Sequence, residues 1–135
     1  MHVTSKVCKR MDLGLCGNLF GGNMLAWMDE AAFIYAKQAT NEQYLVTLKF
    51  SEILFKHPVK EGDIVDFFVD EEQETCPEVG TSSITFNLYV KVKALTVVDT
   101  KCTFVAVNSL GFKKELNPNI KLMFENMRKY GSGAF

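Results

Sequence analysis

The spacing of apolar and polar residues along the chain changes its period after residue 41. From about Leu19 to Ala39 the apolar positions recur at a helical spacing, with Ala, Leu and Met prominent and no proline. They fall on nearly every side of the predicted helix, which is typical of a buried helix. Asn41 suits the end of this helix, because asparagine tolerates the left-handed backbone found there.

Segments rich in β-branched and aromatic residues predict strands before and after this helix. Ser83–Lys93 gives the clearest pattern, because its apolar and polar residues alternate and so predict a strand with one buried face. The other strands are expected at Val3–Lys9, Tyr44–Phe50, Ile64–Asp70 and Lys101–Ser109. The polar stretch from Glu71 to Gly80 is expected to be a long hairpin connection.

The end of the chain predicts a second, short helix at about 117–130. Asn117 suits its N-cap, Pro118 its first helical position, and Gly131 its end. The element order is then a strand, the long helix, four or five strands and the short helix, in one domain covering residues 1–135. We therefore expect an α+β fold in which one antiparallel sheet wraps around the long helix.

The composition is that of a globular protein with 135 residues, 47% of them hydrophobic, and a net charge of −1. This charge gives no overall field that would attract nucleic acid or an anionic membrane. No apolar run approaches the roughly 20 residues of a membrane span, and the N-terminus lacks the apolar core of a secretory signal. The four cysteines form no CxxC pair, so they predict reduced thiols in a cytoplasmic protein rather than a zinc site.

A glycine pair at the start of the long helix is a candidate for binding a carbonyl oxygen. Amide groups in a helix's first turn have no partner within the helix and lie at the positive end of its dipole. Gly22 has no Cβ to keep a ligand away, so these amides predict an oxyanion hole. The alternative is that Gly21 and Gly22 only allow the helix to pack closely against the sheet.

Asp29 is the candidate catalytic carboxylate, because it lies seven residues after Gly22 and shares its helix face. It could instead be satisfied by a backbone amide or a lysine. Glu30 points about 100° away from it, and we interpret Glu30 as structural. No nucleophile–histidine pair competes with Asp29, since His2 is terminal and His57 is expected at the surface of a connection.

The spacing of these two groups constrains the site. Gly22 and Asp29 lie about 10 Å apart along the helix axis, so one carbonyl can hardly contact both within one chain. Two antiparallel copies of the helix would bring Gly22 of one chain beside Asp29 of the other. If both groups act on one carbonyl, the site belongs to a homodimer.

Three short motifs remain: GNLFGG at 17–22 followed by MDEA at 28–31, FKHPVKEGD at 55–63, and the weaker VGTSS at 79–83. Together they resemble the hotdog-fold acyl-CoA thioester hydrolases. The resemblance implies homodimers with shared active sites, often assembled as hexamers from a trimer of dimers. It also implies hydrolysis of a fatty acyl-CoA substrate without a metal or organic cofactor.

The same resemblance implies roles for individual residues. Asp29 matches the catalytic carboxylate, as general base or nucleophile, and Gly22 matches the amide that polarises the thioester carbonyl. The serines of the third motif fall where such enzymes often meet the CoA moiety. The candidate substrate-binding residues are Phe20, Gly21, Thr47, Ser82 and Ser83.

One departure from the family pattern leaves alternatives open. Relatives commonly carry an asparagine at the position of Gly14, where it orients the thioester or the water. In this chain we expect either a lower activity than in those relatives or another polar group, such as Asp12, in place of the asparagine. A second reading is therefore a hotdog protein that binds acyl-CoA without cleaving it. A hotdog dehydratase would need a histidine near the start of the helix, and none lies between Val3 and Lys56.

Overall fold

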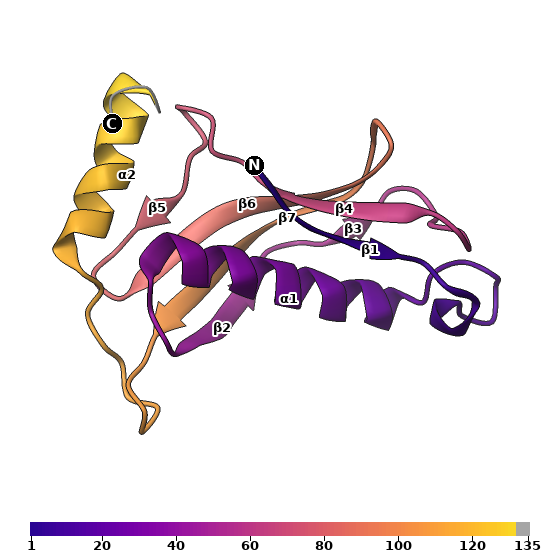
Figure 1. Ribbon diagram of the computed structural model, residues 1–135, viewed down its shortest axis with the longest axis horizontal. Helices are drawn as coiled ribbons and strands as arrows, with labels where there is room; N and C mark the ends of the chain where they lie inside the picture. Colours follow the sequence, from indigo (N-terminus) through magenta and orange to yellow (C-terminus); the bar gives the residue numbers. More distant parts are fainter. Residues whose placement is uncertain (132–135) are drawn as a thin grey trace.

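A long helix lies across one face of an antiparallel sheet (Figure 1). The computed structural model describes residues 1–131, so the last four residues of the predicted domain lie outside the described part. The helices are α1 (Gly21–Thr40) and α2 (Pro118–Tyr130), with a short 3₁₀ turn at Arg10–Asp12. The strands are β1 (His2–Val7), β2 (Leu45–Phe50), β3 (Leu54–Phe55), β4 (Ile64–Val69), β5 (Glu78–Val79), β6 (Ser83–Val92) and β7 (Leu95–Ala106).

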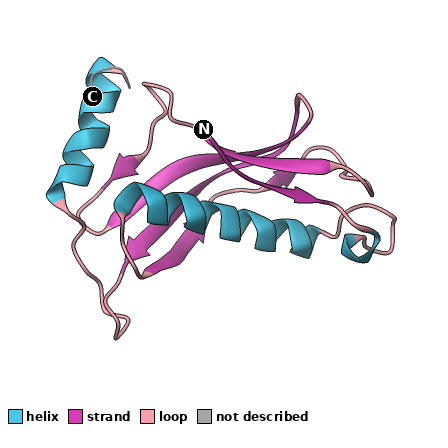
Figure 2. Cartoon of the chain, viewed as in Figure 1, coloured by secondary structure: helices cyan, strands magenta, loops and turns pink. Residues whose placement is uncertain are grey.

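The sheet has the strand order β1-β4-β6-β7-β2, with β3 paired to β7 and β5 paired to β6. All of these pairs are antiparallel. Figure 2 shows α1 lying along the sheet, while α2 stands at one end of it. The predicted combination of one antiparallel sheet and one long helix packed against it is confirmed.

The core lies between α1 and the inward faces of β4, β6 and β7. The alternation predicted for β6 is confirmed, because Ile84, Phe86, Leu88 and Val90 are all buried. The Phe86 ring stacks on Phe104 of β7, with their ring centroids 6.1 Å apart. The buried residues of α1 are Met24, Met28, Ala31, Ala32, Tyr35, Ala36 and Thr40.

The expectation that α1 is buried on most sides is wrong for a single chain. One face packs on the sheet, while Gly22, Leu25, Ala26 and Asp29 are exposed on the other side. Apolar residues on this face are uncovered because no segment within residues 1–131 packs over them. Among residues 1–131, neither helix is long and apolar enough to cross a membrane.

The start of β7 differs from the prediction. The strand begins at Leu95 rather than Lys101, because a tight turn at Lys93 and Ala94 returns the chain directly from β6. Lys93 has a φ of 57°, in the left-handed region, and no glycine or asparagine marks the turn in the sequence. The sequence also does not predict the two-residue strands β3 and β5, since so short a strand shows no alternation of apolar and polar residues.

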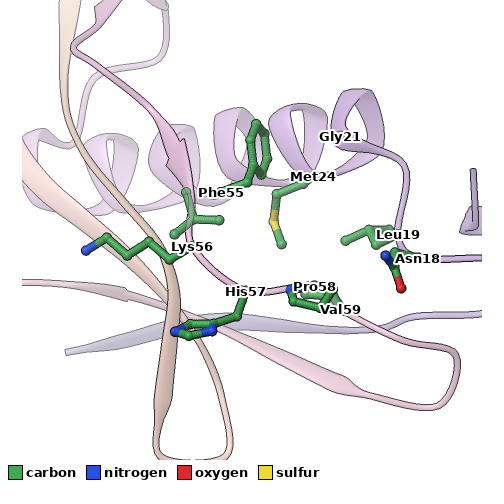
Figure 3. A pocket seen from close by; sticks show the side chains of 10 residues that line it. Asn18, Leu19, Gly21, Met24, Phe55, Lys56, His57, Pro58 and Val59 are labelled. Atoms are coloured by element: carbon green, nitrogen blue, oxygen red, sulfur yellow. The ribbon is translucent and has the colours of Figure 1, made fainter. Parts of the chain in front are cut away.

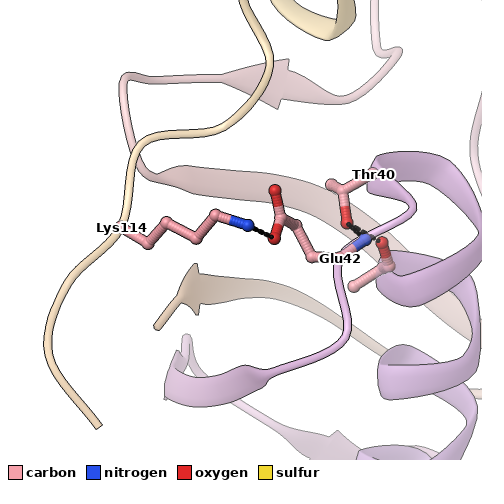
Figure 4. A network of polar contacts seen from close by, with 4 residues as sticks. Thr40, Glu42 and Lys114 are labelled. Carbon is pink, nitrogen blue, oxygen red and sulfur yellow. Dashed lines mark hydrogen bonds and ion pairs between the residues drawn. The ribbon is translucent and has the colours of Figure 1, made fainter. Parts of the chain in front are cut away.

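The junction between α1 and β2 is fixed by a polar network (Figure 4). Asn41 ends the helix as predicted, with a φ of 55°. The Thr40 hydroxyl accepts a hydrogen bond from the Glu42 amide at 3.3 Å, and the buried Glu42 carboxylate accepts one from Lys114 Nζ at 2.7 Å. These contacts set the direction in which β2 leaves the helix.

The left-handed backbone at Asn41 predicts a graded response to substitution. Asn41→Gly should leave the free energy of unfolding nearly unchanged, because glycine adopts this conformation without strain. Asn41→Val should lower it by about 1–2 kcal/mol, since a β-branched side chain is strained there. Urea unfolding of both variants checks this, and equal stabilities would contradict it.

Candidate active site

The first turn of α1 presents unpaired amide groups. Phe20 precedes the helix in an extended conformation and gives no side-chain cap. The Asp12 carbonyl accepts hydrogen bonds from the Phe20 amide and from Asn23 Nδ2, both at 3.0 Å, and so anchors the helix start. In the described part of the chain, the amides of Gly21 and Gly22 donate to no acceptor. Two N–H groups at the positive end of the helix are therefore available to a carbonyl oxygen.

Gly22 also has a packing role. A Cβ at this position would lie 2.7 Å from Cε2 of Phe20, so any side chain would displace that ring. Phe20 itself is 58% exposed and can move. The missing side chain at Gly22 therefore makes room for the Phe20 ring. It does not serve close packing on the sheet, because no sheet atom comes closer than ordinary contact to a Cβ at either glycine, and the one nearest to Gly21, Phe55 Cζ, is 3.7 Å away.

Asp29 is held by a neighbouring strand. The Thr47 hydroxyl donates a hydrogen bond to Asp29 Oδ1 at 2.6 Å, which joins α1 to β2. The β2–β7 pairing shifts its register between Thr47 and Lys49, and such irregularities often re-aim a side chain beside a functional site. Among the described residues, Asp29 Oδ2 accepts no hydrogen bond, so one carboxylate oxygen is oriented and the other is free.

The two candidate catalytic groups remain apart within one chain. Gly22 and Asp29 are both exposed on the uncovered face of α1, separated by Leu25 and Ala26. Seven residues of helix correspond to about 10 Å along the axis. The structure of one chain therefore does not bring these two candidate groups to a single carbonyl.

Ser82 and Ser83 lie at the opposite end of the sheet from the helix start. Ser83 pairs with Val105 near the end of β7, whereas Val98 of the same strand lies beneath the first turn of α1. Seven strand residues correspond to about 23 Å. The structure of one chain does not bring these serines to Gly21 or Gly22.

A cavity of about 320 Å³ opens beside the first turn of α1 (Figure 3). Gly21 lines it, and His57 is exposed at its edge, so His57 lies at the surface as predicted. The other lining residues are Asn18, Leu19, Met24, Phe55, Lys56, Pro58, Val59 and Val98. Sequence reasoning missed the cavity, because its walls come from three separate segments of the chain.

Gly14 has no polar side chain to take the place of the family asparagine, and Asp12 is engaged in the local fold. The Asp12 carboxylate accepts a hydrogen bond from the Lys9 amide at 2.9 Å and so caps the short 3₁₀ turn. A Cβ at Gly14 would lie 3.4 Å from Cδ1 of Phe20, close to ordinary contact. The local fold therefore leaves room for a side chain at Gly14, although the sequence places none there.

Two ionisable groups near Asp29, Glu30 and Cys102, differ from it in their contacts and burial. Glu30 forms an ion pair with Lys6 of β1 at 2.9 Å, which agrees with its structural interpretation. Burial raises the pKa of the Cys102 thiol to about 12, and the charge of Asp29 adds to this shift. Within residues 1–131, no three His, Cys, Asp or Glu side chains are grouped as metal ligands would be.

The sequence and the fold are both similar to those of known thioesterases. The profile of the Thioesterase superfamily matches residues 16–69. An uncharacterized acyl-CoA thioester hydrolase of Buchnera aphidicola subsp. Schizaphis graminum is 30% identical over 125 residues, covering 86% of this chain and 88% of that protein.

Two solved structures share the fold at a recognisable sequence identity. A hexameric thioesterase from Yersinia pestis superposes with a TM-score of 0.78 and 29% identity, covering 87% of this chain and 95% of the other. A hexameric hotdog fold thioesterase of Campylobacter jejuni gives a TM-score of 0.77 and 26% identity, covering 92% and 96% of the two chains.

The burial of three cysteines predicts their reactivity. Cys16 is exposed, whereas Cys8, Cys76 and Cys102 are buried, and burial raises the pKa of both the Cys8 and the Cys102 thiols. Because the thiolate is the reactive form, iodoacetamide near pH 8 should modify Cys16 alone in the native protein. Mass spectrometry of peptides checks this, with all four sites labelled in denaturant as the control. Labelling of native Cys102 as fast as Cys16 would contradict it.

Proposed function

This chain belongs to the hotdog-fold acyl-CoA thioester hydrolases, and on that premise we propose that it cleaves acyl-CoA at a site shared by two copies of the chain. The products are free CoA and a carboxylic acid. One observation carries the proposal: the Thr47-bound carboxylate of Asp29 and the unpaired amide of Gly22 occupy one exposed helix face.

Each group has a distinct role in the proposed reaction. The Gly22 amide of one copy holds the thioester carbonyl oxygen and stabilises the negative charge that develops on it. Asp29 of the other copy either takes a proton from the attacking water or attacks the carbonyl carbon itself. In both routes the CoA thiolate leaves and is protonated, and in the second route water then hydrolyses the acyl anhydride formed on Asp29. Thr47 is a positioning residue, because its hydrogen bond fixes one carboxylate oxygen and leaves the other for the reaction.

The exposed face of α1 supports antiparallel pairing of two copies. In the proposed pair, a two-fold axis passes between Leu25 and Ala26, midway between Gly22 and Asp29, and so places Gly22 of one copy beside Asp29 of the other. Small side chains at Gly22 and Ala26 allow two helices to approach closely, at the usual axis separation of about 8–10 Å. Each pairing of this kind creates two equivalent sites, one at each end of the contact.

The edge of the sheet supports the same pairing. Within residues 1–131, the outer edge of β2 is bonded to no other strand. This edge exposes Val46 and Leu48, which are 47% and 62% accessible. An exposed apolar edge strand next to Asp29 is a ready template for a second copy of β2. We propose that such dimers assemble further into a hexamer, since the two solved relatives are hexameric.

The remaining candidate residues fit the shared site less directly. Phe20 and Gly21 adjoin the Gly22 amide and are proposed to contact the thioester. Ser82 and Ser83 are proposed to contact the CoA moiety, which requires that CoA extend away from the helix start. The free state of all four cysteines agrees with a cytoplasmic location, which we propose on that ground.

Gly14 favours a second candidate function, which is binding of acyl-CoA without cleavage. No side chain at this position can orient the thioester or a water molecule. Calorimetry with acyl-CoA beside a thiol-release assay separates the two functions. Binding without turnover in the unmodified protein would establish the second.

Replacing the carboxylate of Asp29 tests the catalytic assignment. Asp29→Asn should lower kcat for acyl-CoA hydrolysis at least about a hundredfold, because it removes the base or nucleophile. Glu30→Gln is the matched control, since Glu30 is the next carboxylate on the same helix and pairs with Lys6. Release of free CoA thiol from a panel of acyl-CoAs measures both variants. Equal losses in the two would show that Asp29 acts only through the fold.

Mixing two inactive variants tests the shared site. Gly22→Val blocks the carbonyl position and Asp29→Asn removes the carboxylate, so each homodimer should be nearly inactive. In a heterodimer, one site keeps both native groups and the other has neither. Random pairing gives about half heterodimers, so the mixture should recover about a quarter of wild-type activity.

Heterodimers carrying two different affinity tags make this result decisive. After purification on both tags, they should show about half of wild-type activity per dimer, since one of their two sites is intact. Inactive heterodimers would show that Gly22 and Asp29 do not act together across the interface.

A further inference from the structure

The cavity beside the helix start has a buried apolar floor. Met24, Val59 and Val98 line it and are only 2%, 4% and 1% exposed. Figure 3 shows the Met24 side chain pointing from α1 into the space between Leu19 and Phe55. The polar lining residues Asn18, Lys56 and His57 lie nearer the surface, because they come from exposed or half-exposed segments. The cavity therefore has a polar rim and an apolar end.

The mouth of the cavity adjoins the amide that is proposed to hold the thioester. Gly21 lines the cavity, and Gly22 is the next residue. A Cβ at Gly21 would make ordinary contact with Cζ of Phe55, at 3.7 Å, so a side chain at position 21 would fill the space between the helix and this ring. A group attached to a carbonyl at the Gly22 amide can enter here.

We propose that this cavity binds the acyl chain of the substrate and that Met24 sets the longest chain it accepts. This inference rests on the proposed function. Of the two arms of an acyl-CoA thioester, the acyl chain is apolar, while the pantetheine arm carries amide groups. The floor side chains offer no hydrogen-bonding partner, and an unpaired buried amide is costly. The apolar arm is thus the one that fits.

The size of the cavity limits the length of the chain. Its volume of about 320 Å³ lies at the lower end of the range for small-molecule sites. We therefore expect short and medium acyl chains to be cleaved best, with Met24 as the end wall.

Changing the size of residue 24 should move the preferred chain length. Met24→Ala removes three heavy atoms and leaves a cavity, so the optimum of kcat/KM should shift about three carbons longer. Met24→Phe should lower kcat/KM for the longest accepted chains about tenfold while sparing acetyl-CoA. Met24→Leu, which conserves most of the volume, should shift the optimum slightly in the direction of the alanine variant. The measurement is thiol release from acyl-CoAs between acetyl and palmitoyl.

Met28→Ala is the matched control. Met28 lies one turn further along α1 and is fully buried, yet it does not line the cavity. Its substitution should lower the thermal unfolding temperature as Met24→Ala does, but leave the chain-length profile unchanged. Inhibition by free CoA should be the same in the wild type and all variants, because CoA lacks the acyl chain.

Two results would overturn the inference. An unchanged chain-length profile in the folded Met24→Leu and Met24→Phe proteins would show that the acyl chain lies elsewhere. If the Met24 variants lose kcat/KM equally for every chain length and are also inhibited more weakly by CoA, the cavity binds the pantetheine arm instead. If the wild type cleaves no acyl-CoA, the proposed function fails instead, and calorimetric binding of the same acyl-CoA series to each variant tests the role of Met24.

Discussion

The fixed rise of an α-helix is the constraint on which this site depends. Gly22 and Asp29 lie on one face of α1, and two turns of helix keep them about 10 Å apart. No side-chain movement can remove that separation, because both positions belong to one rigid element packed on the sheet. The proposed site brings both groups to one carbonyl through a second helix that runs antiparallel to the first, so the proposed catalytic unit is a pair of chains.

The rest of the fold holds the two half-sites in place. The buried face of α1 packs on the apolar faces of β6 and β7, so the helix cannot rotate without breaking the core. The network around Thr40, Glu42 and Lys114 sets the path into β2, and β2 in turn brings Thr47 to Asp29. In one chain Asp29 is exposed to solvent. A second copy on the same face would exclude water and strengthen the electrostatic effects of both groups.

The sequence predicts the elements with strong local signals. Regular alternation specifies β6, helical spacing specifies α1, and cap residues specify the ends at Asn41 and Asn117. It does not predict the early start of β7, because the turn at Lys93 carries no glycine. The sequence overstates the burial of α1 because composition cannot distinguish a face covered by the same chain from one left for a partner.

The candidate site is predictable in its residue types but not in its contacts. The glycine pair and Asp29 are visible as a local motif, whereas the sequence places Thr47 only among the residues that bind substrate. The hydrogen bond from Thr47 to Asp29 depends on how β2 returns beneath α1, and no local pattern encodes that path. The cavity beside Gly21 likewise combines three segments that meet only in the folded chain.

A crystal structure of the Asp29→Asn variant with bound acyl-CoA would test the shared site most directly. A site shared by two chains requires a thioester carbonyl oxygen about 3 Å from the Gly22 amide nitrogen of one chain. It also requires that the substituted side chain at position 29 of the other chain lie beside the carbonyl carbon. A thioester that contacts both positions of a single chain, or that binds away from Gly22, would contradict it.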